Sequence, residues 1–108
     1  MSEQRLKCCV PFCNRTRGDR KGDPVNRYSE WICGDHWKLV DRRTKLFRRR
    51  CDTALEKARR EVAAYRSRHG DEIHIDLALK INHAGRRAAR AWDRCKREAI
   101  EKGMGIRS

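Results

Sequence analysis

The side chains best suited to chemistry are cysteines and one histidine in the first third of the chain. Cys8, Cys9 and Cys13 fall within six positions, and Cys33 precedes His36 by three. Thiolates and imidazoles are the usual ligands of structural Zn²⁺, which takes four of them in a tetrahedron. Because a pair of such ligands stands on each side of a nineteen-residue spacer, the sequence predicts one zinc site.

The spacing alone leaves the first ligand open. Cys8 or Cys9 can pair with Cys13, while the second pair is Cys33 with His36 at the predicted start of a helix. Residues i and i+3 share a helix face, and a helix N-terminus favours thiolate over thiol. The roughly 35 residues of this segment are mostly polar, so metal binding, which can supply on the order of 10 kcal/mol, would have to support their fold.

The segment "CCVPFCNRTR" followed by "WICGDHW" resembles the Cys-x4-Cys … Cys-x2-His pattern of THAP-type zinc fingers. It is also similar to short fingers of phage and bacterial proteins that begin with "CxVPGC" and close with "CxxH" and an aromatic residue. The resemblance covers about residues 6–38, and fingers of this kind often precede small DNA-binding or nuclease domains. It implies the zinc ligands Cys8, Cys13, Cys33 and His36, with Cys9 as a substitute for Cys8.

Two departures separate this chain from those patterns. Phe12 stands where the phage-type fingers carry glycine. The nineteen-residue spacer leaves little room for the pair of strands with which THAP fingers read DNA. The resemblance therefore implies the metal site more directly than a way of reading DNA.

Composition narrows the class of protein. The chain has 108 residues and a formal net charge of +13, and only 38% of its residues are hydrophobic. Such material suits elongated helices with narrow apolar seams better than a broad core. No apolar stretch approaches the roughly 20 residues of a membrane span, and the first residues lack the apolar region of a signal peptide. We therefore expect an intracellular protein, neither secreted nor membrane-bound, in which clustered cysteines bind metal rather than form disulfides.

Two periodic segments predict helices. In the first, over residues 35–69, mostly apolar residues recur every three or four positions and would form one narrow face of a helix, which we call its seam. Gly70 can supply a left-handed cap at the end of this helix. The second spans residues 71–102, with Asp71 as a candidate cap, although alternation from Ile73 to Ile81 would also suit a strand. Residues 103–108 are expected to fray. The seams are Trp37, Val40, Thr44, Phe47, Cys51, Leu55, Ala58, Val62 and Tyr65, then Leu77, Ile81, Ala84, Ala88, Trp92, Cys95 and Ala99.

These segments together predict a mainly α fold. A small zinc-binding module over residues 1–37 precedes a long, antiparallel, coiled-coil-like hairpin of two helices joined by two or three residues. Cys51 and Cys95 fall on the seams, so we interpret them as small core residues. Gly85 would cost about 1 kcal/mol in a helix, which close approach of the other helix would justify. The pattern does not fix whether the protein is a monomer or a homodimer.

Basic residues line the outer faces of both predicted helices. Arginine outnumbers lysine 20 to 8, and its planar guanidinium suits bidentate contacts with phosphate. A solvated helix face is the simpler interpretation of a charge run, but it accounts poorly for +13. We expect nucleic acid as the partner, DNA rather than RNA, with an acidic protein as the alternative. The candidate contacts are Lys38, Arg42, Lys45, Arg48, Arg49, Arg50, Arg86, Arg90, Arg94 and Arg97.

Catalysis is not expected. The sequence has no glycine-rich phosphate loop, and no serine or cysteine nucleophile has a plausible base nearby. His69, His74 and the "INHAG" segment fall on or beside predicted helices, whereas an HNH nuclease site needs a ββα-metal hairpin. Four protein ligands would also leave a zinc ion no open position for water. We therefore expect a small regulatory or accessory protein of phage type.

Overall fold

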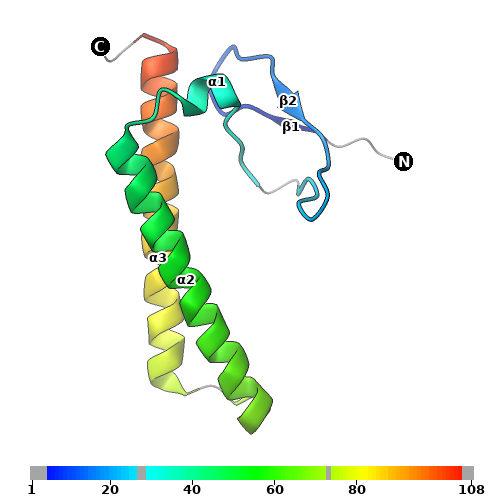
Figure 1. Ribbon diagram of the computed structural model, residues 1–108, viewed down its shortest axis with the longest axis vertical. Helices are drawn as coiled ribbons and strands as arrows, with labels where there is room; N and C mark the ends of the chain where they lie inside the picture. The colour runs from blue at the N-terminus through cyan, green and yellow to red at the C-terminus, as the bar shows by residue number, and fades with distance from the viewer. Residues whose placement is uncertain (1–4, 27–28, 73, 106–108) are drawn as a thin grey trace. The chain divides into compact units, whose positions relative to one another are not determined.

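The computed structural model describes residues 5–26, 29–72 and 74–105, and it is mainly helical as the sequence predicts (Figure 1). Two short strands, β1 (Leu6–Lys7) and β2 (Thr16–Arg17), pair antiparallel. A one-turn helix, α1 (Gly34–Trp37), precedes two long helices, α2 (Arg42–His69) and α3 (Ile75–Gly103). None of these helices is both long enough and apolar enough to cross a membrane.

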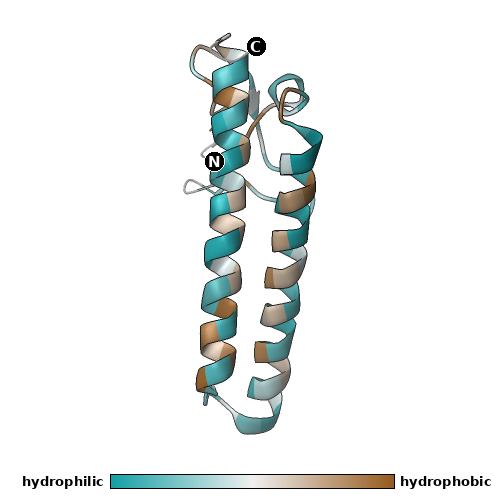
Figure 2. Ribbon diagram, turned by 90° about the vertical axis from the view of Figure 1, so that its left-hand side faces the viewer, coloured by the Kyte–Doolittle hydropathy of each residue, from teal (hydrophilic) through white to brown (hydrophobic). Residues whose placement is uncertain are grey.

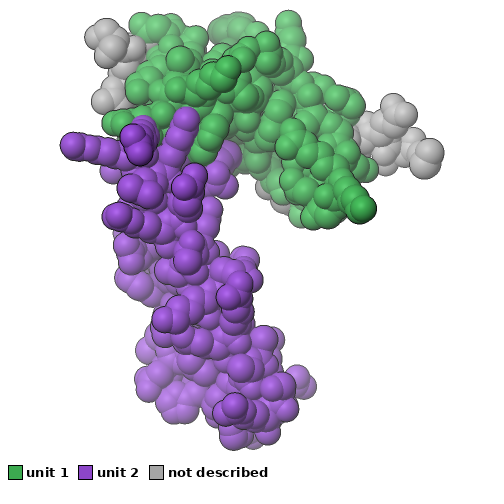
Figure 3. Space-filling view, viewed as in Figure 1, with its two compact units in different colours: residues 1–41, 96–108 green, residues 42–95 purple. Residues whose placement is uncertain are grey.

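The chain divides into two compact units (Figure 3). The metal unit comprises residues 1–41 and 96–108, and the hairpin unit comprises residues 42–95. The boundary falls within α3, so the last eight residues of this helix belong to the metal unit. The zinc-binding module that the sequence predicts over residues 1–37 lies within the metal unit.

In the hairpin unit α2 and the first part of α3 run antiparallel, with the apolar face of α2 turned towards α3 (Figure 2). The thiol of Cys95 lies 3.9 Å from the carbonyl oxygen of Thr44. Further along, Cys51 is in one buried cluster with Ala88 and Ala91. Small residues therefore face each other at several levels, which lets the two backbones pack closely.

The seam residues of both helices are buried or half-buried, in agreement with the periodicity. Cys51 and Cys95 are among the buried ones, at 2% and 0% exposed, as expected of core residues. The periodicity missed Ala91, which is fully buried one turn from Ala88. Alanine gives a weak apolar signal, so its burial follows only from how the helices pack.

The long helix begins at Arg42 and not at residue 35. Between α1 and α2 the chain makes turns in which the N–H of Leu39 bonds the carbonyl of His36, and that of Val40 bonds the carbonyl of Trp37, each at 3.1 Å. These i to i+3 bonds place side chains three residues apart on one side, as a helix does. The seam steps at Trp37 and Val40 therefore could not distinguish a turn from a continuous helix.

The connection between the long helices spans residues 70–74 and is longer than predicted. Gly70 has φ 71° and its N–H bonds the carbonyl of Arg66 at 2.8 Å, so it forms the expected left-handed cap. Asp71 does not cap α3. The ring Nδ1 of His74 accepts a bond from the N–H of Asp76 at 3.2 Å instead, because α3 begins at Ile75. Ile73 lies outside the described residues.

Gly85 is not explained by close approach. The nearest heavy atom to a side chain placed there would be Leu55 Cδ1, at 4.0 Å, which is an ordinary contact. Gly85 also has no left-handed backbone conformation. The structure gives no reason for glycine at this position.

Candidate metal centre

The metal unit brings the four predicted ligands together from three places in the chain. Cys8 follows β1 directly, and its N–H bonds the carbonyl of Arg15 at 3.0 Å, which closes the β1–β2 hairpin. Cys13 ends a tight turn in which its N–H bonds the carbonyl of Val10 at 3.2 Å. Cys33 is the N-cap residue of α1 and His36 lies within that helix.

The turn before Cys13 places Phe12 in the left-handed region, with φ 68°. This is the position at which the phage-type fingers carry glycine. A non-glycine residue in the left-handed conformation lowers the stability of the fold by roughly 1–2 kcal/mol. The phenyl ring is 92% exposed. The departure noted in the sequence is therefore a substitution at a position whose backbone favours glycine.

The ligand atoms of Cys8, Cys13, Cys33 and His36 all lie within 4.8 Å of one another. The Sγ atoms of Cys13 and Cys33 are 3.9 Å apart. His36 presents Nδ1 at 3.6 Å from the Sγ of Cys8 and 3.1 Å from that of Cys33. A tetrahedral ion with ordinary bond lengths separates two sulfur ligands by about 3.8 Å and sulfur from nitrogen by about 3.6 Å. The cluster therefore fits one metal ion.

Burial and neighbouring hydrogen bonds shift the pKa values of the Cys8 and Cys33 thiols in opposite directions. Burial raises the pKa of Cys8, although the N–H groups of Cys33 and Val10 oppose this shift. At Cys33 burial also opposes ionisation, but the N–H of His36 and the thiols of Cys8 and Cys13 outweigh it and lower the pKa. The lowered pKa of Cys33 favours its thiolate form, in keeping with its place at a helix N-terminus.

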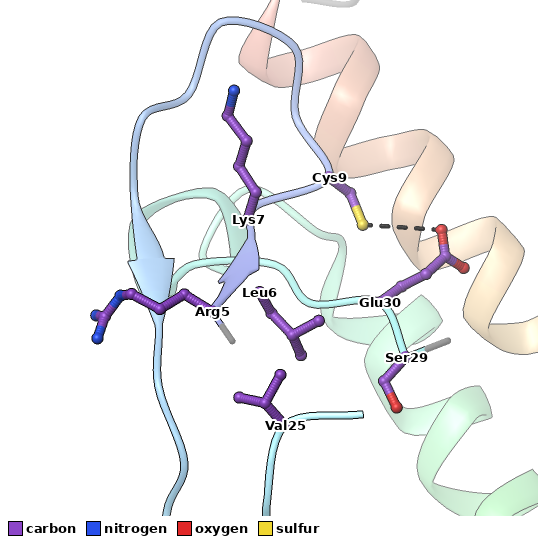
Figure 4. Close-up of a pocket in the computed structure, with 7 residues that line it drawn as sticks. All are labelled: Arg5, Leu6, Lys7, Cys9, Val25, Ser29 and Glu30. Atoms are coloured by element: carbon purple, nitrogen blue, oxygen red, sulfur yellow. Dashed lines mark hydrogen bonds between the residues drawn. The ribbon is translucent and has the colours of Figure 1, made fainter. Parts of the chain in front are cut away.

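Cys9 points away from the cluster, which answers the question that the spacing left open. Its Sγ lies 3.9 Å from Oε2 of Glu30 (Figure 4), and burial raises the pKa of this thiol. Glu30 also accepts a hydrogen bond from Nζ of Lys96 at 2.7 Å. Cys8 therefore supplies the ligand, and Cys9 lines an adjoining hollow of about 520 Å³ with Leu6, Val25 and Glu30.

The last turns of α3 contact the N-terminal segment at three positions, which sequence reasoning missed. Besides Lys96, the buried carboxylate of Glu98 accepts the N–H of Asp41 at 3.0 Å. Gly103 lies against Val10 and His36. In the segment predicted to fray, the N–H groups of Met104 and Gly105 bond carbonyls of α3, and residues 106–108 lie outside the described residues. No sequence signal links Gly103 to His36, which stands 67 positions earlier.

The predicted basic residues do not form one stripe. Lys38 lies in the turn before α2 and Arg97 lies in the final turns of α3, so both belong to the metal unit. Arg48 is half-buried: its guanidinium lies 4.7 Å from the centre of the Trp92 ring and 3.5 Å from Asp52. Within the hairpin unit, Arg48 is therefore less available than the exposed arginines of α2.

Four of the remaining predicted residues lie on two faces. In α2, Arg42 and Arg49 lie opposite the buried side chains, and in α3 Arg86 and Arg90 do so, whereas Lys45 is half-buried next to Thr44. Because the buried sides of the two helices face each other, these two sets point in opposite directions. The sequence had placed Arg94 across from Arg49. Helical phase places Arg94 on a flank of α3 instead.

That flank carries arginines from both helices. The guanidinium of Arg87 lies 6.0 Å from the centre of the Phe47 ring, which identifies the side on which these edges of α2 and α3 meet. Arg94 is two turns beyond Arg87, and Arg43 and Arg50 stand in the same relation on the edge of α2 beside Phe47. We call Arg43, Arg50, Arg87 and Arg94 the arginine flank. Arg43 and Arg87 were not among the predicted contacts.

Comparisons with known proteins do not assign the chain to a family. No protein-family model matches the chain, and neither a curated protein nor a solved structure matches it significantly. The likeness to THAP-type and phage-type fingers therefore rests on the pattern of cysteines and histidine in the sequence alone.

Proposed function

We propose that this protein binds one zinc ion in the metal unit and contacts nucleic acid, duplex DNA by preference, through the arginine flank of the hairpin unit. Its role is binding rather than catalysis. The observation that carries the nucleic-acid proposal is the concentration of arginine on one flank of an already basic unit.

Zinc is the metal that suits three thiolates and one imidazole in a closed tetrahedral set. When bound, it would hold the two ends of the nineteen-residue spacer together and screen the negative charge of the thiolates. Cys8, Cys13, Cys33 and His36 use all four positions. The centre therefore suits a structural role, with the binding surface elsewhere.

The charge of the hairpin unit supports a polyanionic partner. Residues 42–95 contain 16 lysines and arginines against 7 acidic residues. Several of those acids are already paired, for example Glu61 with Lys80 at 2.8 Å. Within the arginine flank, residues seven apart on each helix stand about 10 Å apart along the axis. Such a row can contact separate phosphates of a nucleic-acid backbone, and guanidinium groups favour phosphate.

A salt titration of binding tests this proposal. We expect the parent protein to bind a random-sequence DNA duplex with an affinity that falls steeply with salt, as release of counterions requires. Replacing Arg50 and Arg87 together by Gln should lower the slope of log affinity against log salt by about 1.8 if each contacts one phosphate. The loss should be similar on every sequence, because phosphate contacts carry no base information.

The matched control is the double replacement of Arg59 and Arg66 by Gln. These arginines are also seven apart and exposed, but they lie on the other flank of α2. The control removes the same charge, so any effect of net charge alone will appear in both variants. Equal slopes for the two variants would show that the arginine flank is only a solvated surface.

A second candidate function is docking on an acidic protein, and Phe12 favours it. This ring is exposed at a backbone position that suits glycine, so folding of the chain does not account for it. This function predicts little binding to duplex DNA near physiological salt by the parent protein. It also predicts that Phe12→Ala weakens a purified complex with an acidic partner while leaving the metal content unchanged.

A further inference from the structure

Gly103 lies closer to the metal centre than its place in the sequence suggests. A Cβ atom built on this residue would stand 2.9 Å from Cγ1 of Val10. It would also stand 3.1 Å from Cδ2 and 3.4 Å from Nε2 of His36. Real Cβ atoms almost never approach another heavy atom to less than 3.0 Å, so a side chain at this position would force its neighbours to move.

Neither neighbour can move easily. Val10 is buried, at 3% exposed, and its branched side chain is stiff at χ1. His36 turns the other edge of its ring, Nδ1, towards the Sγ atoms of Cys8 and Cys33. A displacement of this ring would therefore move a ligand atom away from the thiols.

Backbone conformation does not explain the glycine. Gly103 is the last residue of α3 and is not in the left-handed region, whereas Gly105, two residues later, has φ 73°. The N–H of Gly105 bonds the carbonyl of Lys102 at 3.1 Å, so Gly105 serves the turn that ends the helix. The requirement for glycine at position 103 is one of space.

We propose that Gly103 is a positioning residue of the metal centre and that the C-terminal end of α3 is part of that centre. The absent side chain leaves room for the His36 ring to direct Nδ1 towards the three thiols. Lys96 and Glu98 hold the same end of the helix through Glu30 and the N–H of Asp41. Metal binding and attachment of residues 96–105 are therefore linked, and each strengthens the other. This inference rests on the proposed metal site.

Titration with Co²⁺, followed by competition with Zn²⁺, tests the role of Gly103. Tetrahedral Co²⁺ with thiolate ligands has visible absorption bands that report the geometry of the ligands directly. We expect Gly103→Val to lower the affinity for Co²⁺ by ten- to a hundred-fold, the usual effect of changing a residue that orients a ligand. The variant should also alter the d–d bands, while Gly103→Ala should fall between it and the parent protein.

Gly34→Ala is the matched control. Gly34 lies between two ligands in the sequence, but no heavy atom is within 4 Å of the position its Cβ would take, and its φ is ordinary. We expect this variant to bind Co²⁺ within about twofold of the parent and to keep its spectrum. If Gly34→Ala and Gly103→Val weaken binding equally, Gly103 has no special role and the inference is overturned.

Hydrogen exchange in the parent protein gives a test that no variant can obscure by misfolding. The N–H groups of Met104 and Gly105 bond carbonyls at the end of α3, at 3.0 and 3.1 Å. Removal of the metal by a chelator should speed exchange at these amides, and amides near Ala58 should not respond. Unchanged exchange at Met104 and Gly105 would overturn the linkage. A parent protein that binds neither Co²⁺ nor Zn²⁺ would instead overturn the proposed metal site itself.

Discussion

The two units of this chain maintain their structures by different means. The hairpin unit consists of two long helices whose seams bury small residues such as Cys51, Ala58 and Ala91. The metal unit has two strands of two residues, one turn of helix and the end of α3. Its buried apolar residues in the N-terminal segment are few, chiefly Val10, Ile32 and Val40 beside the ligands Cys8 and Cys33.

This difference predicts how far the structural effect of a substitution extends within each unit. In a helix each residue added to the end gains a hydrogen bond locally, and a seam distributes burial over many positions. In the metal unit the loops meet at four ligand atoms, and a loss at one of them affects all the segments. We therefore expect a substitution in one unit to leave the other unit unchanged.

The largest effect is expected from Cys33→Ser, which removes the ligand with the lowered thiol pKa. The metal unit should lose its folded amide signals because metal binding supplies on the order of 10 kcal/mol in such small modules. In nuclear magnetic resonance spectra, the amide signals of residues 5–41 should lose the dispersion of a folded segment, while most signals of residues 42–95 should persist. Cys9→Ser, which changes a thiol directed at Glu30, should keep the metal. Collapse of both units together would show that they fold as one.

A smaller effect, confined to the hairpin unit, is expected from Ala91→Leu. Ala91 is 0% exposed and lies in the cluster of Cys51 and Ala88, next to Phe47 and Leu55. Three extra carbon atoms must displace these neighbours, which costs about 1–3 kcal/mol. Chemical denaturation followed by helical circular dichroism should show the loss. The bound metal per chain should remain at the parent value, and a fall in metal content would contradict the separation of the units.

Gly85→Ala should stabilise the hairpin unit by about 0.5–1 kcal/mol. Alanine forms helix better than glycine, and the new Cβ would make only an ordinary contact with Leu55. The midpoint of denaturation should rise with an unchanged slope. A decrease would mean that the helices approach more closely here than the distance of 4.0 Å indicates.

The smallest effect concerns the exposed pair of Glu61 and Lys80. The hydrogen bond from Lys80 lowers the pKa of Glu61 in the folded protein. The resulting stabilisation is present at pH above the ordinary carboxyl pKa and is lost as the pH falls through the lowered value. Glu61→Gln should therefore slightly flatten the acid side of the stability profile measured by denaturation. Lys80→Met should flatten it slightly less, because Lys57 also lowers the pKa of Glu61. No change in Lys80→Met would assign the effect to other groups.

The sequence predicts the hairpin better than the position of its ends. Seven seam residues of α2, from Thr44 to Tyr65, are buried or half-buried as the periodicity requires. The start of α2 depended on the turn between α1 and Arg42, whose i to i+3 bonds imitate the spacing of a helix. The start of α3 depended on His74, a residue that propensities do not identify as a cap.

The four ligands of the candidate centre could be proposed from their spacing because metal binding restricts the types and number of the residues that take part. Gly103 could not be identified in the same way. Its importance arises from the packing of Val10 and His36 against the end of α3, and contacts at that separation leave no local pattern. The arginine flank was missed for a related reason, since the side on which two helices meet is set by their packing.

The shared helix α3 has a consequence for the synthesis of the protein. All four ligands are present once residue 36 has been made, but the glycine that lies against His36 comes 67 positions later. At about 5–20 residues per second, translation of that interval lasts roughly 3–13 seconds. During this time the ribosome-bound chain has its cysteines but lacks the helix end that lies against the histidine. If Gly103 positions His36 as proposed, the four side chains would hold a metal ion less tightly during this interval than in the finished protein.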